Sequence, residues 1–234
     1  MDARGDFAVP ASGERLSSAC ASQPVDGTAP EGAAPEPYQA WLVDLDGTLY
    51  DARVIRLVMP AELLLTGFTA IPIIRQFRRE HERLRRELHD PVDSPFALQI
   101  SRTAETLGVT CFEVERRVDE WMVRRPAKWL RRARRQSLLD EILRFRQTGG
   151  HTAVVSDYPA RHKLRAMGVE SLFDAVVANG EPGGPPRLKP HPDGLLAAAA
   201  ALGVVPERCL VIGDRPDADG AAAKAAGMAF RLIR

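Results

Sequence analysis

The second half of the chain alternates short apolar runs with helical segments, and this alternation limits the folds open to it. The apolar runs cover residues 152–157, 173–179, 208–214 and 228–234, and a shorter one lies upstream at 41–43. The helical segments between them cover residues 137–150, 160–168, 193–203 and 221–227. Strands that are apolar throughout are typical of parallel sheets covered by helices on both faces. The sequence therefore predicts an α/β fold, a doubly wound parallel sheet with a Rossmann-like core.

Polar side chains follow several of these predicted strands. In an open parallel sheet, ligands bind beyond the carboxyl ends of the strands, so polar residues there are candidates for a site. Three predicted strands end or continue in such residues, and one lysine follows the third strand in a loop: Asp44 and Asp46, Ser156 and Asp157, Asp214, and Lys189. We expect these side chains to gather at one edge of the sheet.

The stretch VDLDGTLYD, residues 43–51, places two aspartates one residue apart. Side chains at positions i and i+2 of an extended chain point to the same side, so Asp44 and Asp46 are expected to face one pocket. Adjacent carboxylates repel each other and favour a nearby cation or a shared proton. Asp214 and Asp219 add further acid from another strand end, and a cluster of carboxylates without His or Cys suits Mg²⁺.

Carboxylates, Mg²⁺ and a lysine together indicate phosphoryl chemistry. The metal and the lysine would neutralise phosphate oxygens. One carboxylate can attack phosphorus to give an acyl phosphate, and a second can protonate the leaving alcohol. The substrate is then expected to be a small-molecule or lipid-like phosphate.

Four segments resemble, in order, the motifs of the haloacid dehalogenase-like hydrolase superfamily: VDLDGTLYD, VVSD, LKP and VIGDRPDADGAAAKAAGM. The resemblance implies that Asp44 is the nucleophile and a magnesium ligand. It implies that Asp46 is the general acid/base, with its backbone carbonyl on the metal, and that Lys189 steadies nucleophile and phosphate. The phosphate-binding positions are Thr48, Ser156, Asp157 and Lys189. The metal ligands are Asp44, Asp46, Asp214 and Asp219, with Asp217 left open as the second acid of the fourth motif.

Asp46 also bears on the reaction type within this family. Dehalogenases of the family lack an acid at this position, so its presence implies a phosphatase or a phosphomutase. The expected activity is Mg²⁺-dependent hydrolysis of a phosphomonoester through an aspartyl phosphate. Two alternatives stay open: a phosphomutase, and a membrane-surface or partner-binding protein of the same fold with little turnover.

The spacing of the motifs predicts the domain organisation. Asp44 and Ser156 lie 112 positions apart, whereas Ser156 and Lys189 lie 33 apart, so the long insertion falls between the first two motifs. By the resemblance, residues 53–135 form a helical cap, and residues 38–52 and 136–234 form the catalytic core. Residues 1–37 are rich in Ala, Pro, Gly and Ser and poor in large apolar residues, which predicts disorder.

The predicted cap is unusual in charge and in one apolar stretch. It holds 18 basic and 11 acidic residues, a net charge of +7, and residues 124–135 include seven basic residues and no acid. Residues 57–74 contain a single charge, Glu62. We interpret this stretch as two buried helices broken at Pro72. The alternative is an apolar cap face that, with Trp121, Trp129 and Leu130, contacts an anionic membrane surface.

Bulk composition adds little about partners. The whole chain has 27% charged residues and a net charge of +1, so nothing in its charge predicts a nucleic-acid partner. The three cysteines have unrelated spacings, which predicts neither a disulfide framework nor a zinc site. This cysteine usage favours a reducing compartment, and we expect the protein to be cytoplasmic.

Overall fold

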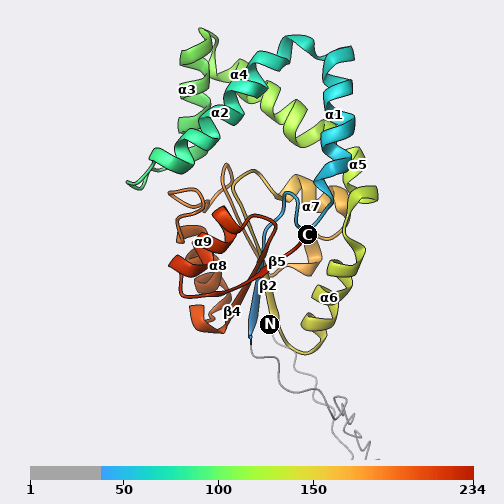
Figure 1. Cartoon of the computed structure of the whole chain (residues 1–234), viewed down its shortest axis with the longest axis vertical. Coiled ribbons are helices and arrows are strands. Elements are labelled where there is room, and N and C mark those ends of the chain that lie inside the picture. The colour runs from blue at the N-terminus through green and yellow to red at the C-terminus, as the bar shows by residue number, and fades with distance from the viewer. Residues whose placement is uncertain (1–37) are drawn as a thin grey trace, which may run out of the picture. The chain divides into compact units, whose positions relative to one another are not determined.

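The computed structural model describes residues 38–234, and the predicted disorder of residues 1–37 lies outside them. Five parallel strands form one sheet in the order β3-β2-β1-β4-β5 (Figure 1). Their bounds are β1 Ala40–Val43, β2 His151–Ser156, β3 Ala175–Ala178, β4 Cys209–Gly213 and β5 Ala229–Leu232. The sheet confirms the predicted parallel α/β core.

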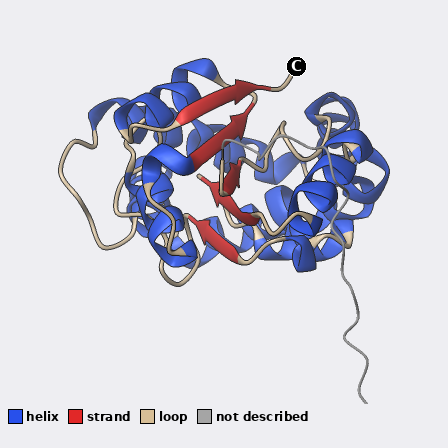
Figure 2. Cartoon of the chain, turned by 90° about the horizontal axis from the view of Figure 1, so that it is seen from below, coloured by secondary structure: helices blue, strands red, loops and turns tan. Residues whose placement is uncertain are grey.

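Helices cover both faces of the sheet (Figure 2). On one face, Trp41 and Val43 pack with apolar residues of α6 (Gln136–Gln147) and α7 (Arg161–Met167). On the other face, Ala40 and Leu42 pack with α8 (Asp193–Leu202) and α9 (Ala221–Ala225). Alternate residues of β1 therefore serve opposite layers, which explains why the strand is apolar throughout and confirms the doubly wound arrangement.

Six helices lie between β1 and β2. Five of them precede α6: α1 Ala52–Thr66, α2 Ile71–Glu87, α3 Pro95–Leu107, α4 Cys111–Val118 and α5 Arg125–Ala133. The short turns are η1 Phe68–Ala70, η2 Asp119–Arg124, η3 Glu170–Leu172, η4 Pro206–Arg208 and η5 Pro216–Gly220. The inserted helices share an apolar cluster that includes Phe77, Val114 and Trp121. Residues 36–234 form one compact unit by their contacts, so the division at residues 53 and 135 stays a prediction.

The two connections between the inserted helices and the sheet run side by side. Tyr50 and Arg134 form an isolated antiparallel bridge. The amide of Asp51 donates to the carbonyl of Ala133, and the amide of Arg135 donates to the carbonyl of Leu49, each at 2.8 Å. The Asp51 side chain also caps α1 by accepting a hydrogen bond from the Arg53 amide. The entry and exit of the insertion are thus tied together.

The apolar stretch 57–74 differs from its predicted form in two respects. The break falls at Gly67, where any Cβ would collide with the Trp121 ring, whereas Pro72 lies in the first turn of α2. Proline fits there because the first helical amides have no intrahelical acceptor. Nor is the stretch fully buried, since four large apolar side chains of α1 and η1 are exposed: Leu57, Leu64, Leu65 and Phe68.

Within residues 38–234, no single helix is both long enough and apolar enough to span a membrane. Helix α1 and the segment Phe68–Glu87 reach the threshold only as a pair, and they are bent by 110° at the break between them.

Candidate active site

The candidate site lies at the carboxyl ends of the two central strands. Asp44 follows β1, Asp214 follows β4, and Asp219 lies in η5 just beyond. One carboxylate oxygen from each of these three residues lies within 4.8 Å of the others. The Lys189 ammonium bridges two of them, with Nζ 2.7 Å from Asp44 Oδ1 and 2.7 Å from Asp219 Oδ1. The strand-end prediction therefore brings four distant residues into one cluster.

The electrostatics of this cluster show how strongly it favours positive charge. Burial raises the pKa of Asp44 to about 7, and the neighbouring Asp219 adds to the rise although Lys189 opposes it. Burial and Asp219 also raise the pKa of Asp214. Burial alone would lower the pKa of Lys189, but the charges of Asp44 and Asp219 raise it above its ordinary value. One ammonium thus does not fully balance three crowded carboxylates.

The donor set fits a hard divalent cation. All three side chains offer carboxylate oxygens, and such oxygens are what Mg²⁺ prefers in proteins. Asp44, Asp214 and Asp219 are the residues that would hold it. The Asp46 carboxylate is not in this cluster, so a contact of Asp46 with the metal would depend on its backbone carbonyl, which stays a prediction.

Gly47 makes room for the cluster. Its φ is +102°, and a Cβ at this position would lie 2.2 Å from Asp214 Oδ2. Replacing Gly47 by Ala is therefore expected to displace Asp214, to strain the backbone, and to destabilise the fold by about 2 kcal/mol. Urea unfolding measures the loss, and Mg²⁺ titration should show weakened binding. Gly168→Ala is the control, because φ is +72° there but no atom lies within 4 Å of the added Cβ.

Asp46 belongs to a second group of contacts. Lys163 of α7 places its Nζ 2.6 and 2.8 Å from the two carboxylate oxygens of Asp46. The Tyr50 hydroxyl also donates to Asp46 Oδ1. The strand ends at Val43 and a turn begins at Asp46, so the alternation of an extended chain no longer applies there. Asp44 and Asp46 consequently have separate sets of hydrogen-bond partners.

The predicted phosphate-binding residues divide into two groups. Thr48 Oγ1 donates to Asp44 Oδ2 at 2.9 Å, beside the Lys189 contact, and Ser156 is buried at the end of β2. Asp157 does not fit the prediction. Its carboxylate accepts from Arg85 Nη2 at 2.6 Å and from the Lys189 amide at 3.2 Å, so it carries negative charge and its oxygens are already bound.

The charge of Asp157 also argues against a phosphate contact. Burial favours its neutral form, but Lys189 and Arg85 lower its pKa below the ordinary value. A buried, ionised carboxylate would repel a phosphate. In the structure Asp157 anchors Arg85 of α2 to the end of β2, and a contact of Asp157 with phosphate stays a prediction.

The fourth motif contains two candidate acids that the sequence left open. Asp219 is buried and contacts Lys189, whereas Asp217 is exposed and pairs with Arg215 at 2.6 Å. The charge of Arg215, through that hydrogen bond, lowers the pKa of Asp217. The geometry favours Asp219 as the member of the carboxylate cluster.

Sequence reasoning missed three residues that shape the site: Tyr50, Arg85 and Lys163. Tyr50 follows the two aspartates without a pattern of its own, and Lys163 lies in a short helix in which nothing separates it from its exposed neighbour His162. Arg85 lies in RREHERLRREL, whose charges at helical spacing are typical of a solvated helix surface. This pattern describes Arg83 and Glu87, an exposed i, i+4 pair, but not Arg85, which reaches the sheet. No sequence signal identifies these three.

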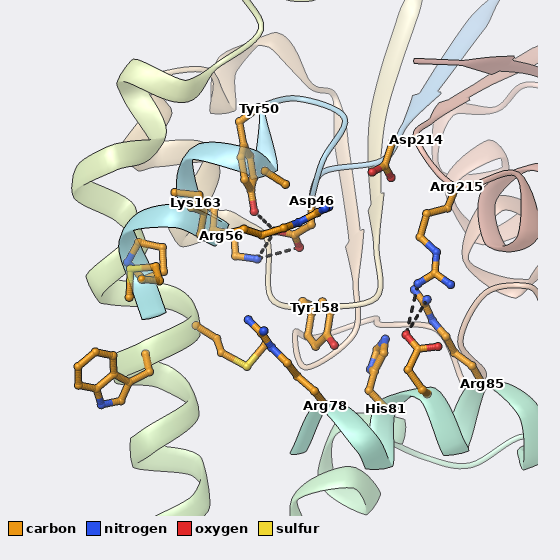
Figure 3. A pocket seen from close by; sticks show the side chains of 17 residues that line it. Asp46, Tyr50, Arg56, Arg78, His81, Arg85, Tyr158, Lys163, Asp214 and Arg215 are labelled. Carbon is orange, nitrogen blue, oxygen red and sulfur yellow. Dashed lines mark hydrogen bonds and ion pairs between the residues drawn. The ribbon is translucent and has the colours of Figure 1, made fainter. Parts of the chain in front are cut away.

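A cavity of about 370 Å³ opens beside Asp46 and Asp214 (Figure 3). Residues from α1, α2 and η2 form its far side, including Ile55, Met59, Arg78 and Trp121. The core contributes Tyr158 and Lys163. The cavity therefore lies between the inserted helices and the strand ends, next to the carboxylate cluster, where a substrate can approach it.

Several basic side chains of residues 124–135 form ion pairs within the protein. Arg124 pairs with Asp119, Arg125 with Glu120, and Lys128 with Glu62. Trp121 and Leu130 are buried. In the alternative in which the cap contacts a membrane, these two side chains cannot take part, because both pack inside the protein.

The chain was then compared with known proteins. The family model described as haloacid dehalogenase-like hydrolase matches residues 38–227. No curated protein matches the chain significantly. Among solved structures, a HAD phosphatase from Thermococcus onnurineus is 22% identical with a TM-score of 0.54, and 84% of this chain covers 86% of that one.

Two further structures show the same fold. The L-2-haloacid dehalogenase of Xanthobacter autotrophicus is 18% identical with a TM-score of 0.58, and 84% of this chain covers 77% of that one. The HAD-hydrolase YfnB from Bacillus subtilis, bound to magnesium, is 18% identical with a TM-score of 0.53. The match covers 84% of this chain and 86% of YfnB. Ordered motifs, sheet topology and family match agree: the chain belongs to the haloacid dehalogenase-like hydrolase family.

Proposed function

We propose that the protein is a Mg²⁺-dependent phosphatase that hydrolyses a phosphomonoester through an aspartyl phosphate on Asp44. The observation that carries the proposal is the bridge of Lys189 Nζ between Asp44 and Asp219, beside Asp214 and a cavity. A lysine fixed on the attacking carboxylate can neutralise a phosphate oxygen as the bond to phosphorus forms. The presence of Asp46, an acid that can serve the leaving group, favours a phosphatase over a dehalogenase.

In the proposed two-step hydrolysis, Asp44 acts as the nucleophile and Asp46 as the acid and then the base. An Asp44 carboxylate oxygen attacks phosphorus, and the bond from phosphorus to the ester oxygen breaks. Asp46 gives its proton to the departing alkoxide and becomes the base. Asp46 then takes a proton from water, the water oxygen attacks the phosphoryl group, and inorganic phosphate leaves Asp44 free. Mg²⁺ held by Asp44, Asp214 and Asp219 would supply charge neutralisation for the phosphoryl oxygens.

Neighbouring side chains position the two acids for these steps. Thr48 and Lys189 contact different oxygens of Asp44 and so fix the plane of its carboxylate. Tyr50 and Lys163 hold the Asp46 side chain at the edge of the cavity (Figure 3). Both contacts restrict rotation before substrate arrives, which is how an active site lowers the entropic part of a barrier.

The test is phosphate release from 4-nitrophenyl phosphate by the full chain, with Mg²⁺ or with a chelator, and for Asp44→Asn. Support requires release that depends on Mg²⁺ and is lost in the variant. Stoichiometric inorganic phosphate indicates hydrolysis, whereas return of the phosphoryl group to substrate indicates a mutase. Full activity of Asp44→Asn, or of wild type in chelator, would overturn the proposal. Cys111 and Cys209 are free thiols, so the assay is run under reducing conditions.

The exposed apolar side chains favour a second role, peripheral contact with an anionic bilayer. We define the α1 stripe as Leu57, Leu64, Leu65 and Phe68, which are between 66% and 82% exposed. Arg53 precedes the stripe, and Glu62, the acid on α1, pairs with Lys128. An apolar stripe with cationic flanks complements an anionic membrane surface.

Flotation with vesicles tests this second role. We expect the full chain to float with phosphatidylserine-containing vesicles, and Leu64→Gln with Leu65→Gln to reduce the bound fraction about tenfold. Leu143→Gln on α6, which changes a 44% exposed leucine remote from the stripe, is the control. Equal flotation of the stripe variant and wild type, or no flotation of wild type, would refute the membrane contact.

A further inference from the structure

The cavity beside Asp46 is larger and more varied than one phosphate requires. Its volume is about 370 Å³, and part of its wall is apolar. Ile55 and Met59 of α1 lie on this wall with Trp121, Met122 and Pro126. A phosphate group has no use for an apolar wall, so these side chains indicate that the alcohol part of the substrate has an apolar segment.

Five basic side chains line the same cavity, and three of them have acidic partners. Lys163 pairs with Asp46, Arg85 with Asp157, and Arg215 with Asp217. The other two are Arg56 of α1 and Arg78 of α2. Within residues 38–234, neither forms an ion pair. Of the other acids on the wall, Glu82 is bound by Arg85 and Arg215, and Asp214 belongs to the carboxylate cluster.

The side chain of Arg78 points into the cavity, toward Tyr158 and the Asp46 side (Figure 3). Burial raises the pKa of Tyr50 and of Tyr158, but the positive charge of Arg78 acts in the opposite direction on both. Its guanidinium therefore lies close enough to both phenols to be felt electrostatically. Arg56 enters from α1, near Lys163 and Asp46.

We propose that the substrate is a phosphomonoester with a second anionic group, which Arg78 and Arg56 bind while the apolar wall holds the segment between the two anions. The inference rests on the proposed phosphatase function. Lys189, and a metal held by Asp44, Asp214 and Asp219, would balance the charge of the transferred phosphate, so the two guanidinium groups are not needed for it. Arginine forms paired hydrogen bonds with carboxylates and phosphates, which suits either group as the second anion.

Three aryl phosphates with closely matched leaving groups separate the charge effect from reactivity. They are 4-(carboxymethyl)phenyl phosphate, its phosphonomethyl analogue, and the neutral 4-(carbamoylmethyl)phenyl phosphate. The amide has nearly the shape of the carboxylate but lacks its charge. We expect wild type to show kcat/KM about 10- to 100-fold higher for at least one anionic compound than for the amide. Which anionic compound is preferred identifies the second group as carboxylate or phosphate-like.

Variants assign the preference to the two arginines. Arg78→Gln should lower the ratio of anionic to neutral kcat/KM to within about threefold of unity, and Arg56→Gln should lower it in part. Arg79→Gln is the matched control, because Arg79 is the next residue of α2 and lines a different surface with Ile71 and Leu107. We expect that control to retain the wild-type ratio.

The outcomes distinguish this inference from the proposed function. If wild type hydrolyses all three compounds with equal kcat/KM, or if Arg78→Gln and Arg56→Gln both retain the wild-type ratio, the inference is wrong and the phosphatase stands. If wild type releases phosphate from none of them and not from 4-nitrophenyl phosphate either, the proposed function fails and the inference fails with it.

Discussion

Asp44→Asn is expected to lower kcat on a phosphomonoester by about 10⁴-fold or more, because an amide oxygen does not form a stable bond to phosphorus. Lys189, Thr48 and the acid Asp46 would remain in the variant, but they act on a nucleophile that is no longer there. Steady-state phosphate release and trapping of a phosphorylated protein both measure the loss. Single-turnover experiments with labelled substrate should show no label on the variant chain.

Asp44→Asn, which abolishes activity, is expected to increase the stability of the folded protein. In metal-free protein, burial raises the pKa of Asp44 to about 7, well above its value in an unfolded chain. Between about pH 4 and pH 7 the folded state thus holds a proton that the unfolded state has lost, so rising pH destabilises the folded state. Asn cannot ionise. In chelator at pH 7.5, we expect the free energy of unfolding of Asp44→Asn to exceed that of wild type by roughly 1 kcal/mol.

Asp217→Asn is the control for both effects, because Asp217 is exposed and outside the carboxylate cluster. It should retain wild-type kcat and, between about pH 5 and pH 7, the wild-type dependence of stability on pH, because the lowered pKa of Asp217 affects stability only at more acidic pH. An active Asp44→Asn, or an inactive Asp217→Asn with an intact fold, would contradict the assignment of the nucleophile.

Lys189→Met is expected to impair both folding and catalysis. The Lys189 ammonium is 6% exposed and bridges Asp44 and Asp219, so its removal leaves buried carboxylates without their cation. Breaking a buried ion pair from one side costs about 3–5 kcal/mol. Urea unfolding in chelator should show a loss of this size. Loss of the lysine charge at the reacting phosphate should lower kcat by about 10³-fold.

Added Mg²⁺ tests whether the missing positive charge causes the loss of stability in Lys189→Met. A divalent cation among the same carboxylates can replace part of the missing charge, so Mg²⁺ should stabilise Lys189→Met more than it stabilises wild type. Lys224→Met on the exposed side of α9 is the control and should change stability by less than about 0.5 kcal/mol. A Lys189→Met protein with wild-type stability in chelator would show that the bridge contributes nothing to the fold.

The fold was predictable because its signals are local. Strands β1, β2 and β4 are apolar runs that end in polar residues, and α7 ends at Gly168 in the left-handed conformation, as a glycine after the helical run RHKLRAM predicts. Where local signals compete, the prediction failed: Pro72 was taken as the break, although proline fits a first turn. Gly67 is the break because the Trp121 ring occupies the space of a side chain there, a tertiary contact 54 positions away.

The candidate site was predictable in its core and not at its edge. Asp44, Asp214, Asp219 and Lys189 follow strands or a loop at one end of a sheet, and the topology of the sheet brings them together. Lys163, Arg85 and Arg78 depend on how helices pack over that edge. Each lies in a segment of similar charged residues, and only packing separates the one that points inward from those that face solvent.

The position of β1 in the middle of the sheet has a consequence for the order of folding. Its partners β2 and β4 begin at His151 and Cys209, so β1 finds no neighbour until more than a hundred further residues have been made. The intervening helices have their own apolar cluster and can collapse first. Contacts between segments so distant in the chain form slowly. The carboxylate cluster, which needs both central strands and η5, is therefore among the last parts of the molecule to be completed during folding.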